Sequence, residues 1–132
     1  MANKGTTSSR RYINLPGRPL DMPFSDAVLA GDTLYISGRI GIDPVTGTVP
    51  AEIGAEMDIL FREFEAVLAA AGMSMDDLVQ VQVFCPDVSL WQQFNREYVK
   101  HFSQEFPARA FLGSGPLLMG GHFEMMGIAN KS

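Results

Sequence analysis

The sequence predicts an α+β fold in which two helices pack on one face of a mixed β-sheet. In residues 53–71, apolar side chains recur at steps of three and four, which indicates an amphipathic helix. Short apolar runs bounded by Gly, Pro or Asp precede and follow this segment, as is typical of strands. With 132 residues and 46% hydrophobic content, the chain has the size and composition of one globular domain.

The N-terminal part is expected to form a tail and three strands. Residues 1–9 are polar and small, so we expect a flexible tail, followed by a single domain over residues 10–132. Gly31-Asp32 has the composition of a two-residue hairpin turn. Ser37-Gly38, inside an apolar run, indicates a bulge or a backbone that another group approaches closely. The strand candidates are residues 11–15, 25–30 and 33–40.

Two helices are expected in the middle of the chain. The helix over residues 53–71 ends at Gly72, a common C-terminal stop. Its charged residues fall mostly off the apolar stripe: Glu56, Arg62, Glu63 and Glu65. A second helix is expected to begin at Ser89 as its cap, with apolar residues at four-residue spacing: Leu90, Phe94, Tyr98 and Phe102.

Three more strands are expected, over residues 78–84, 106–113 and 122–129. The last two each hold one charge among apolar residues, Arg109 and Glu124. A guanidinium cannot be neutralised near pH 7, so a buried Arg109 needs an anionic partner, either a protein carboxylate or a ligand. A structural ion pair between Arg109 and Glu124 and a polar site inside the sheet both fit this pattern.

Composition excludes several classes of partner. The net charge is −5 and no Lys/Arg cluster exists beyond Arg10-Arg11, so nucleic acid is not expected. No apolar run approaches the roughly 20 residues that span a membrane, and residues 1–9 do not form a secretory signal. The single cysteine, Cys85, cannot form an internal disulfide, which fits a reducing compartment. We therefore expect a cytoplasmic protein without a membrane or nucleic-acid partner.

The expected sheet has one face that two helices cannot cover. Its strands carry Val, Leu and Phe on both sides, and such a face needs another layer. The sequence therefore predicts a homo-oligomer in which a second copy supplies that layer.

Five segments resemble the Rid family, also called YjgF or reactive intermediate/imine deaminase family. They are residues 23–28, 34–40, 43–47, 106–109 and 123–125, and the resemblance runs over residues 20 to 129. It implies a chorismate-mutase-like α+β fold and a homotrimer whose strands close a central barrel, with clefts between subunits. Prototype members hydrolyse enamines and imines, released by pyridoxal-phosphate enzymes, to a 2-keto acid and ammonia without a cofactor.

The resemblance also implies roles for residues at matching positions. Arg109 matches the arginine that grips the substrate carboxylate, Glu124 matches the glutamate that handles the attacking water, and Ser37-Gly38 matches a segment lining the cleft. A forked guanidinium binds a carboxylate bidentately, and one carboxylate can serve both the water and the leaving nitrogen. We therefore expect a small carboxylate substrate, with Arg109 and Glu124 as the catalytic pair.

Three positions depart from the family pattern. Phe24 stands where prototypes carry tyrosine, Arg39 where they carry glutamine, and Phe111 where they carry cysteine. These side chains are expected to line a cleft that is shaped for a different, bulkier substrate. By period two, His122 is expected to share a strand face with Glu124 and to contact substrate or a proton; a metal site is not expected, because a third ligand is missing.

Two other functions fit parts of the pattern. A non-catalytic regulatory module would use the same Arg109 cleft to hold a small carboxylic acid. A nuclease or translation-inhibitor activity is sometimes attached to the family, but the acidic charge of this chain argues against it.

Overall fold

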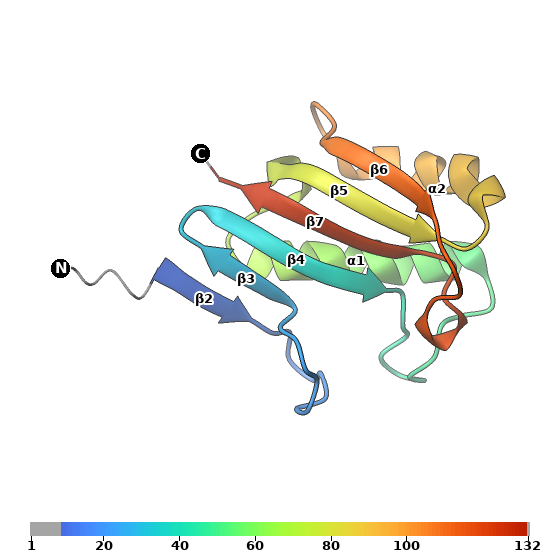
Figure 1. Cartoon of the computed structure of the whole chain (residues 1–132), viewed down its shortest axis with the longest axis horizontal. Coiled ribbons are helices and arrows are strands. Elements are labelled where there is room, and N and C mark those ends of the chain that lie inside the picture. The colour runs from blue at the N-terminus through green and yellow to red at the C-terminus, as the bar shows by residue number, and fades with distance from the viewer. Residues whose placement is uncertain (1–8, 132) are drawn as a thin grey trace.

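A computed structural model describes residues 9–131, which form one six-stranded mixed sheet (Figure 1). The spatial order of the strands is β2-β3-β4-β7-β5-β6, and only the β5–β6 pair is parallel. The predicted tail lies outside the described residues except for Ser9. The strands are β2 (Arg10–Ile13), β3 (Ala27–Ala30), β4 (Thr33–Ile40), β5 (Leu78–Cys85), β6 (Ala108–Gly113) and β7 (Glu124–Asn130).

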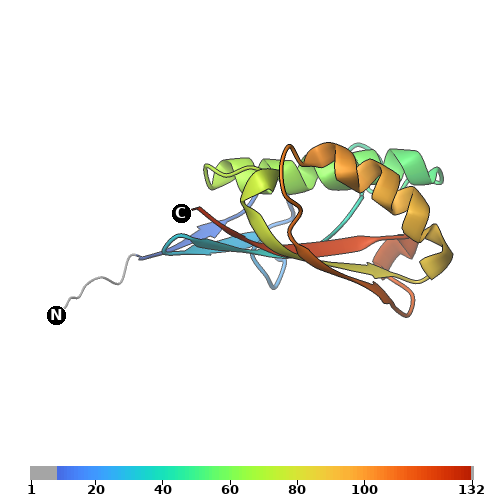
Figure 2. The same ribbon diagram turned by 90° about the horizontal axis from the view of Figure 1, so that it is seen from above.

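Both helices lie on the same face of the sheet, as Figure 2 shows, which confirms the predicted α+β arrangement. They are α1 (Ile53–Ala70) and α2 (Trp91–Tyr98). The core lies between the helices and the sheet, where aromatic rings of both layers meet: Phe94 of α2 lies 5.6 Å from Phe61 of α1 and 4.9 Å from Phe123, measured between ring centroids. Neither helix is long and apolar enough to cross a membrane.

The second helix begins differently from the prediction. Asp87, not Ser89, caps the 3-10 turn that precedes α2: its Oδ1 accepts hydrogen bonds from the Ser89 backbone N–H (3.0 Å) and from the Ser89 hydroxyl (2.6 Å). Aspartate and serine are both good cap residues, and here the chain begins to turn two residues earlier than the apolar spacing indicates.

The hairpin and the irregularity in β4 match the sequence pattern. Ala30 pairs with Thr33 across Gly31-Asp32, and Gly31 has a φ of +62°. Further along β4, the register with β7 shifts between Ile36 and Arg39, so two residues, Ser37-Gly38, lie between these register positions. The predicted bulge is therefore present at this point.

The helix-free face of the sheet carries a row of apolar side chains. Tyr12, Val28, Tyr35 and Ile128 are register partners on four neighbouring strands. The two tyrosines remain 59% and 51% exposed. Within residues 9–131, no other element covers this row. The homo-oligomer expected from the sequence therefore stays a prediction, and this row defines the surface it would bury.

Candidate functional site

Arg109 lies on the edge strand β6 and points to the helix side of the sheet. Its register partner on β5, Val81, is fully buried. Its guanidinium carbon lies 4.6 Å from the ring centroid of Tyr98 and 5.6 and 6.0 Å from those of Phe111 and Phe94. Aromatic faces attract a cation, so the rings hold this side chain in place without a carboxylate.

A hollow of about 290 Å³ lies beside this guanidinium, between α2 and the start of β6. Three of its polar atoms are buried and have no hydrogen-bond partner among the residues that the structure describes: Asn95 Oδ1, Tyr98 Oη and Arg109 Nη1. Because buried polar groups are nearly always paired in folded proteins, three unpaired atoms in one hollow indicate a site for a polar ligand. We call it the α2 hollow; its lining is Asn95, Tyr98, Val99, Phe106, Pro107 and Arg109.

The hydrogen-bonding capacity of the α2 hollow defines the ligand that fits it. Burial raises the pKa of Tyr98 to about 12, although the nearby Arg109 charge acts in the opposite direction. The phenol is therefore protonated at neutral pH and can donate. Arg109 can only donate, so these two residues together suit an anionic acceptor such as a carboxylate.

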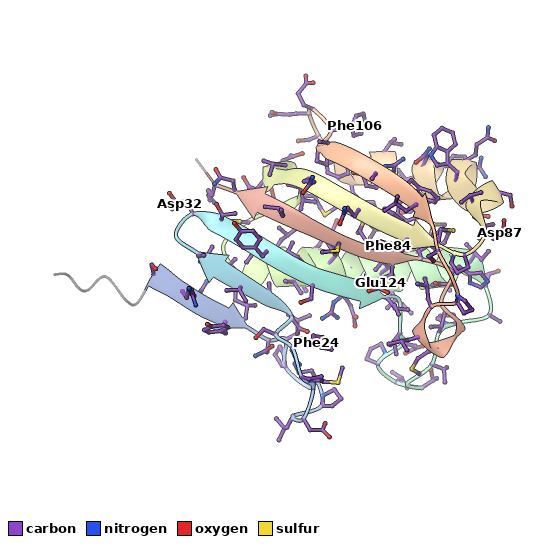
Figure 3. All side chains as sticks on the ribbon, viewed as in Figure 1. Phe24, Asp32, Phe84, Asp87, Phe106 and Glu124 are labelled. Atoms are coloured by element: carbon purple, nitrogen blue, oxygen red, sulfur yellow. The ribbon has the colours of Figure 1, made fainter. Side chains whose placement is uncertain are left out.

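Glu124 begins β7 and lies on the opposite, helix-free face of the sheet. Its register partners are Ile40 on β4 and Phe84 on β5, and Figure 3 shows Phe84 and Glu124 close together near one end of the sheet. The carboxylate lies directly over Gly38, where a Cβ would overlap Glu124 Oε2. The glycine of the bulge therefore leaves the space that this carboxylate occupies.

Arg109 and Glu124 do not form an ion pair within one chain. Strand β5 separates their strands, with Val81 beside Arg109 and Phe84 beside Glu124. Side chains alternate along a strand, so positions 81 and 84 point to opposite faces of the sheet. The structural ion pair that the sequence left open is excluded within a single chain.

Phe24 belongs to a loop between β2 and β3 that surrounds a hollow of about 590 Å³. The residue is 47% exposed, and its ring centroid lies 5.3 Å from the guanidinium carbon of Arg18. Arg18 also donates to the Phe24 carbonyl and pairs with Asp26, at 3.0 Å. The loop is thus held to the sheet through Asp26, which is only 5% exposed.

Arg39 is held by two carboxylates in the layer between the sheet and α1. Its Nη2 lies 2.9 Å from Asp26 Oδ1, and its Nη1 lies 2.8 Å from Glu63 Oε1. Both terminal nitrogens of Arg39 are therefore paired within the chain, and Arg39 links the Phe24 loop to α1. The ligand contact expected of Arg39 from the sequence stays a prediction.

The remaining expected site residues fall on two sides of the sheet. The Ser37 hydroxyl donates to the Ser25 carbonyl (2.6 Å), so it fixes the bulge beside Gly38. Phe111 packs edge-to-face on Phe94, on the helix side with Arg109. The structure therefore places Arg109 and Phe111 together on the helix side, and Gly38 and Glu124 together on the opposite face. Within one chain, the sheet separates these two pairs.

His122 lies in a bend before β7, and its ring is held by Glu56 of α1. Glu56 Oε1 lies 2.7 Å from His122 Nδ1, and Oε2 accepts from the backbone N–H groups of His122 (2.7 Å) and Phe123 (3.2 Å). Strand β7 begins only at Glu124, so His122 lies outside it and the alternation of side chains along a strand does not place His122 on the face of Glu124. The His122 ring instead turns toward Glu56 of α1.

The sequence pattern assigns Glu56 to the polar side of the first helix, which is wrong: its side chain is fully buried. Glu56 comes three residues after Ile53 and four before Leu60, so helical spacing places it on the apolar stripe. This spacing is the signal in the sequence that indicates a buried Glu56. Its three donors come from a segment 66 residues away, which the sequence does not reveal.

Replacing Glu56 by Leu is expected to lower the free energy of unfolding by about 2–4 kcal/mol, because two backbone N–H groups and the His122 ring lose their buried acceptor. Asp58→Leu, at an exposed position of the same helix, is the matched control. Urea unfolding of both variants measures the difference. Equal stability of the two would contradict the anchoring role of Glu56.

The family model described as Endoribonuclease L-PSP matches residues 18–131. The chain belongs to this family, the Rid or YjgF family. A RutC family protein of Saccharolobus solfataricus is 39% identical over 111 residues, which are 83% of this chain and 88% of that protein. The 2-iminobutanoate/2-iminopropanoate deaminase of Capra hircus is 34% identical over 122 residues, 91% of this chain and 89% of that protein.

Solved Rid-family structures share the fold. RidA from a Psychrobacter species superposes with a TM-score of 0.84 at 32% identity, covering 92% of this chain and 99% of that chain. The Rid-family protein YyfA from Yersinia pestis gives a TM-score of 0.85 at 30% identity with the same coverage of both chains. The Rid-type fold expected from the resemblance is therefore confirmed.

Proposed function

We propose that this Rid-family protein is a hydrolytic deaminase that converts reactive 2-imino and enamine acids to 2-keto acids and ammonia. The observation that carries the proposal is Arg109 Nη1, buried and unpaired in the α2 hollow. Relatives named 2-iminobutanoate/2-iminopropanoate deaminase support the same chemistry; the one from Capra hircus is 34% identical to this chain.

Arg109 binds the substrate carboxylate in this proposal. A guanidinium offers two parallel N–H groups, so it holds a carboxylate in one plane and fixes the imine carbon beside it. The aromatic rings around Arg109 keep its guanidinium group oriented before the ligand binds. This pre-organisation lowers the entropic cost of placing a reactive carbon.

Glu124 acts on water. It takes a proton as water adds to the imine carbon, which gives a carbinolamine, and it returns a proton to the nitrogen. The carbon–nitrogen bond then breaks, the nitrogen leaves as ammonia, and the hydroxyl becomes the carbonyl of the 2-keto acid. Substrate and water account for every atom of the products.

The two residues meet only if two copies of the chain form the site. Arg109 and Glu124 lie on opposite faces of the same sheet, so a single substrate cannot contact both within one chain. A homotrimer with sites between subunits resolves this, because one copy supplies Arg109 and its neighbour supplies Glu124. The exposed row of Tyr12 and Tyr35 supports burial of the helix-free face by another copy.

Ammonia release from freshly generated 2-aminoacrylate and bulkier imino acids tests the proposal. We expect a rate above the buffer background that is lost in Arg109→Ala and retained in Arg96→Ala, an exposed arginine of α2. A rate at background for the native chain across the whole panel would overturn the deaminase assignment.

Gly38→Ala is expected to lower this activity by about 10- to 100-fold, since the new methyl group takes the place of Glu124 Oε2 and displaces a catalytic carboxylate. Gly54→Ala is the matched control, because a Cβ at Gly54 meets no atom within 4 Å. Steady-state ammonia release measures both variants. Full activity in Gly38→Ala would show that the position of Glu124 over this glycine is not required.

One observation favours a second function, a non-catalytic module that binds small carboxylic acids. The α2 hollow with Arg109 is complete within one chain, whereas the acid/base carboxylate is not part of it. Arg109-dependent binding of keto acids by a chain that releases no ammonia would support this alternative.

A further inference from the structure

We propose that His101 is a positioning residue for Arg109: in its doubly protonated form it links the end of α2 to α1, and ligand affinity at Arg109 falls when His101 loses its second proton. His101 ends the 3-10 turn Val99–His101, which follows α2 directly. The inference rests on the proposed function, since it takes Arg109 as the residue that holds the carboxylate. It adds a control of binding by pH, exerted from outside the α2 hollow.

Both nitrogens of the His101 ring lie within hydrogen-bond distance of a carboxylate. Nδ1 lies 2.7 Å from Glu65 Oε2 on α1, and Nε2 lies 3.0 Å from Glu97 Oε2 on α2. An ionised carboxylate can only accept, so both contacts are hydrogen bonds only when both ring nitrogens carry a proton. The geometry therefore fits an imidazolium cation between two anions, one from each helix. We call these three side chains the His101 clamp.

The charged groups that face the His101 ring favour this cation. They are Glu65 from α1, and Glu97 and Lys100 from the segment of His101 itself. Lys100 Nζ lies 3.4 Å from Glu97 Oε1, but Lys100 is exposed, so water screens its charge. The hydrogen bond from His101 is the main cause that lowers the pKa of Glu97. A cation is also favoured at this place because it follows the C-terminal end of a helix.

Aromatic rings connect the His101 clamp to Arg109. The His101 ring stacks on the fully buried Phe61, with ring centroids 4.2 Å apart and 7° between the ring planes. Phe61 contacts Tyr98 edge-on, at 6.3 Å between centroids, and the Arg109 guanidinium carbon lies 4.6 Å from the Tyr98 centroid. Tyr98 comes only three residues before His101, so the clamp fixes the turn of α2 that orients Arg109.

Loss of the second proton weakens the His101 clamp. A neutral imidazole has one N–H, so its other nitrogen presents a lone pair to a carboxylate oxygen, and this contact between two acceptors is repulsive. The end of α2 is then no longer held from both sides. A ligand that binds at Arg109 must order this turn again, which costs part of the binding free energy. Affinity for a carboxylate is therefore high while His101 is doubly protonated and falls as the pH rises through its titration.

Calorimetry with 2-ketoisovalerate over about pH 6 to 9 tests the proposal. This 2-keto acid carries no nitrogen to release, and its carboxylate stays ionised in this range, so changes in affinity report on the protein. We expect the native protein to bind it about three- to tenfold more weakly at the high end of the range. At intermediate pH, binding is expected to take up about 0.3–0.5 proton per ligand, measured in two buffers of different ionisation enthalpy.

Substitution of His101 separates the clamp from simple packing. His101→Phe keeps a flat ring on Phe61 but cannot carry a proton. We expect it to bind the acid with one affinity over the whole range, near the native value at high pH, and to take up no proton. His101→Gln repeats the test with a neutral polar side chain if His101→Phe does not fold. Arg96→Gln, at an exposed position of α2, is the matched control: it removes a positive charge and should keep the native pH profile.

The outcomes distinguish this inference from the proposed function. The chain holds two histidines, so nitrogen NMR resolves the His101 ring and shows whether it carries both protons. A His101 ring that is neutral over the whole range, or a native pH profile in His101→Phe, would overturn the inference alone, with Arg109-dependent binding intact. Keto-acid binding that does not require Arg109, together with no ammonia release from imines, would overturn the proposed function as well.

Discussion

Replacing Glu124 by Gln is expected to lower kcat for imine hydrolysis by about 100- to 10,000-fold, while the affinity for 2-ketoisovalerate stays within about twofold. Glutamine keeps the length and shape of the side chain over Gly38 but cannot take a proton from water. In the proposed assembly, Arg109 of one copy holds the ligand carboxylate, while Glu124 of the neighbouring copy acts on water at the imine carbon. Removing the charge of Glu124 therefore leaves the main carboxylate contact in place.

The measurement pairs steady-state ammonia release with calorimetry on the same preparations. Glu52→Gln is the matched control, because Glu52 is exposed and its side chain makes no cap hydrogen bond at the start of α1. Unchanged turnover in Glu124→Gln would remove this residue from the chemistry. Loss of keto-acid binding would instead place its carboxylate among the groups that hold the ligand.

Much of the fold is encoded in local patterns. The apolar stripe over residues 53–71 matches α1 to within one residue at its C-terminal end, and β4 spans the predicted residues 33–40. Those patterns succeed because a helix or strand must turn one periodic face to the core. The start of α2 is less predictable, since Asp87 and Ser89 are both good caps and only the path of the loop selects Asp87.

The candidate site is encoded in two different ways. Arg109 and Glu124 stand out in the sequence because a charge in an apolar strand needs a partner or a ligand. Asn95 does not stand out, since a polar residue on a short amphipathic helix usually faces solvent. Its importance comes from Arg109, whose strand lies beside α2 and encloses the Asn95 amide oxygen in the α2 hollow.

Mixing two inactive variants, Arg109→Ala and Glu124→Gln, is expected to restore activity to about a quarter of the native level. Each site in the proposed assembly takes Arg109 from one copy and Glu124 from the next. In an equal, random mixture, half of the copies supply an intact arginine and half supply an intact glutamate, so about one site in four has both. The result follows from the opposite faces that these residues occupy within one chain.

The double variant Arg109→Ala/Glu124→Gln provides the control for this complementation. Mixed with either single variant, it leaves every site without an arginine or without a glutamate, so no activity should return. Ammonia release is measured after the subunits are exchanged by mild unfolding and refolding, and native mass spectrometry verifies that mixed assemblies form. Mixed assemblies of the two single variants that stay inactive would contradict a site between subunits, because a site within one chain would carry one of the two lesions in every copy.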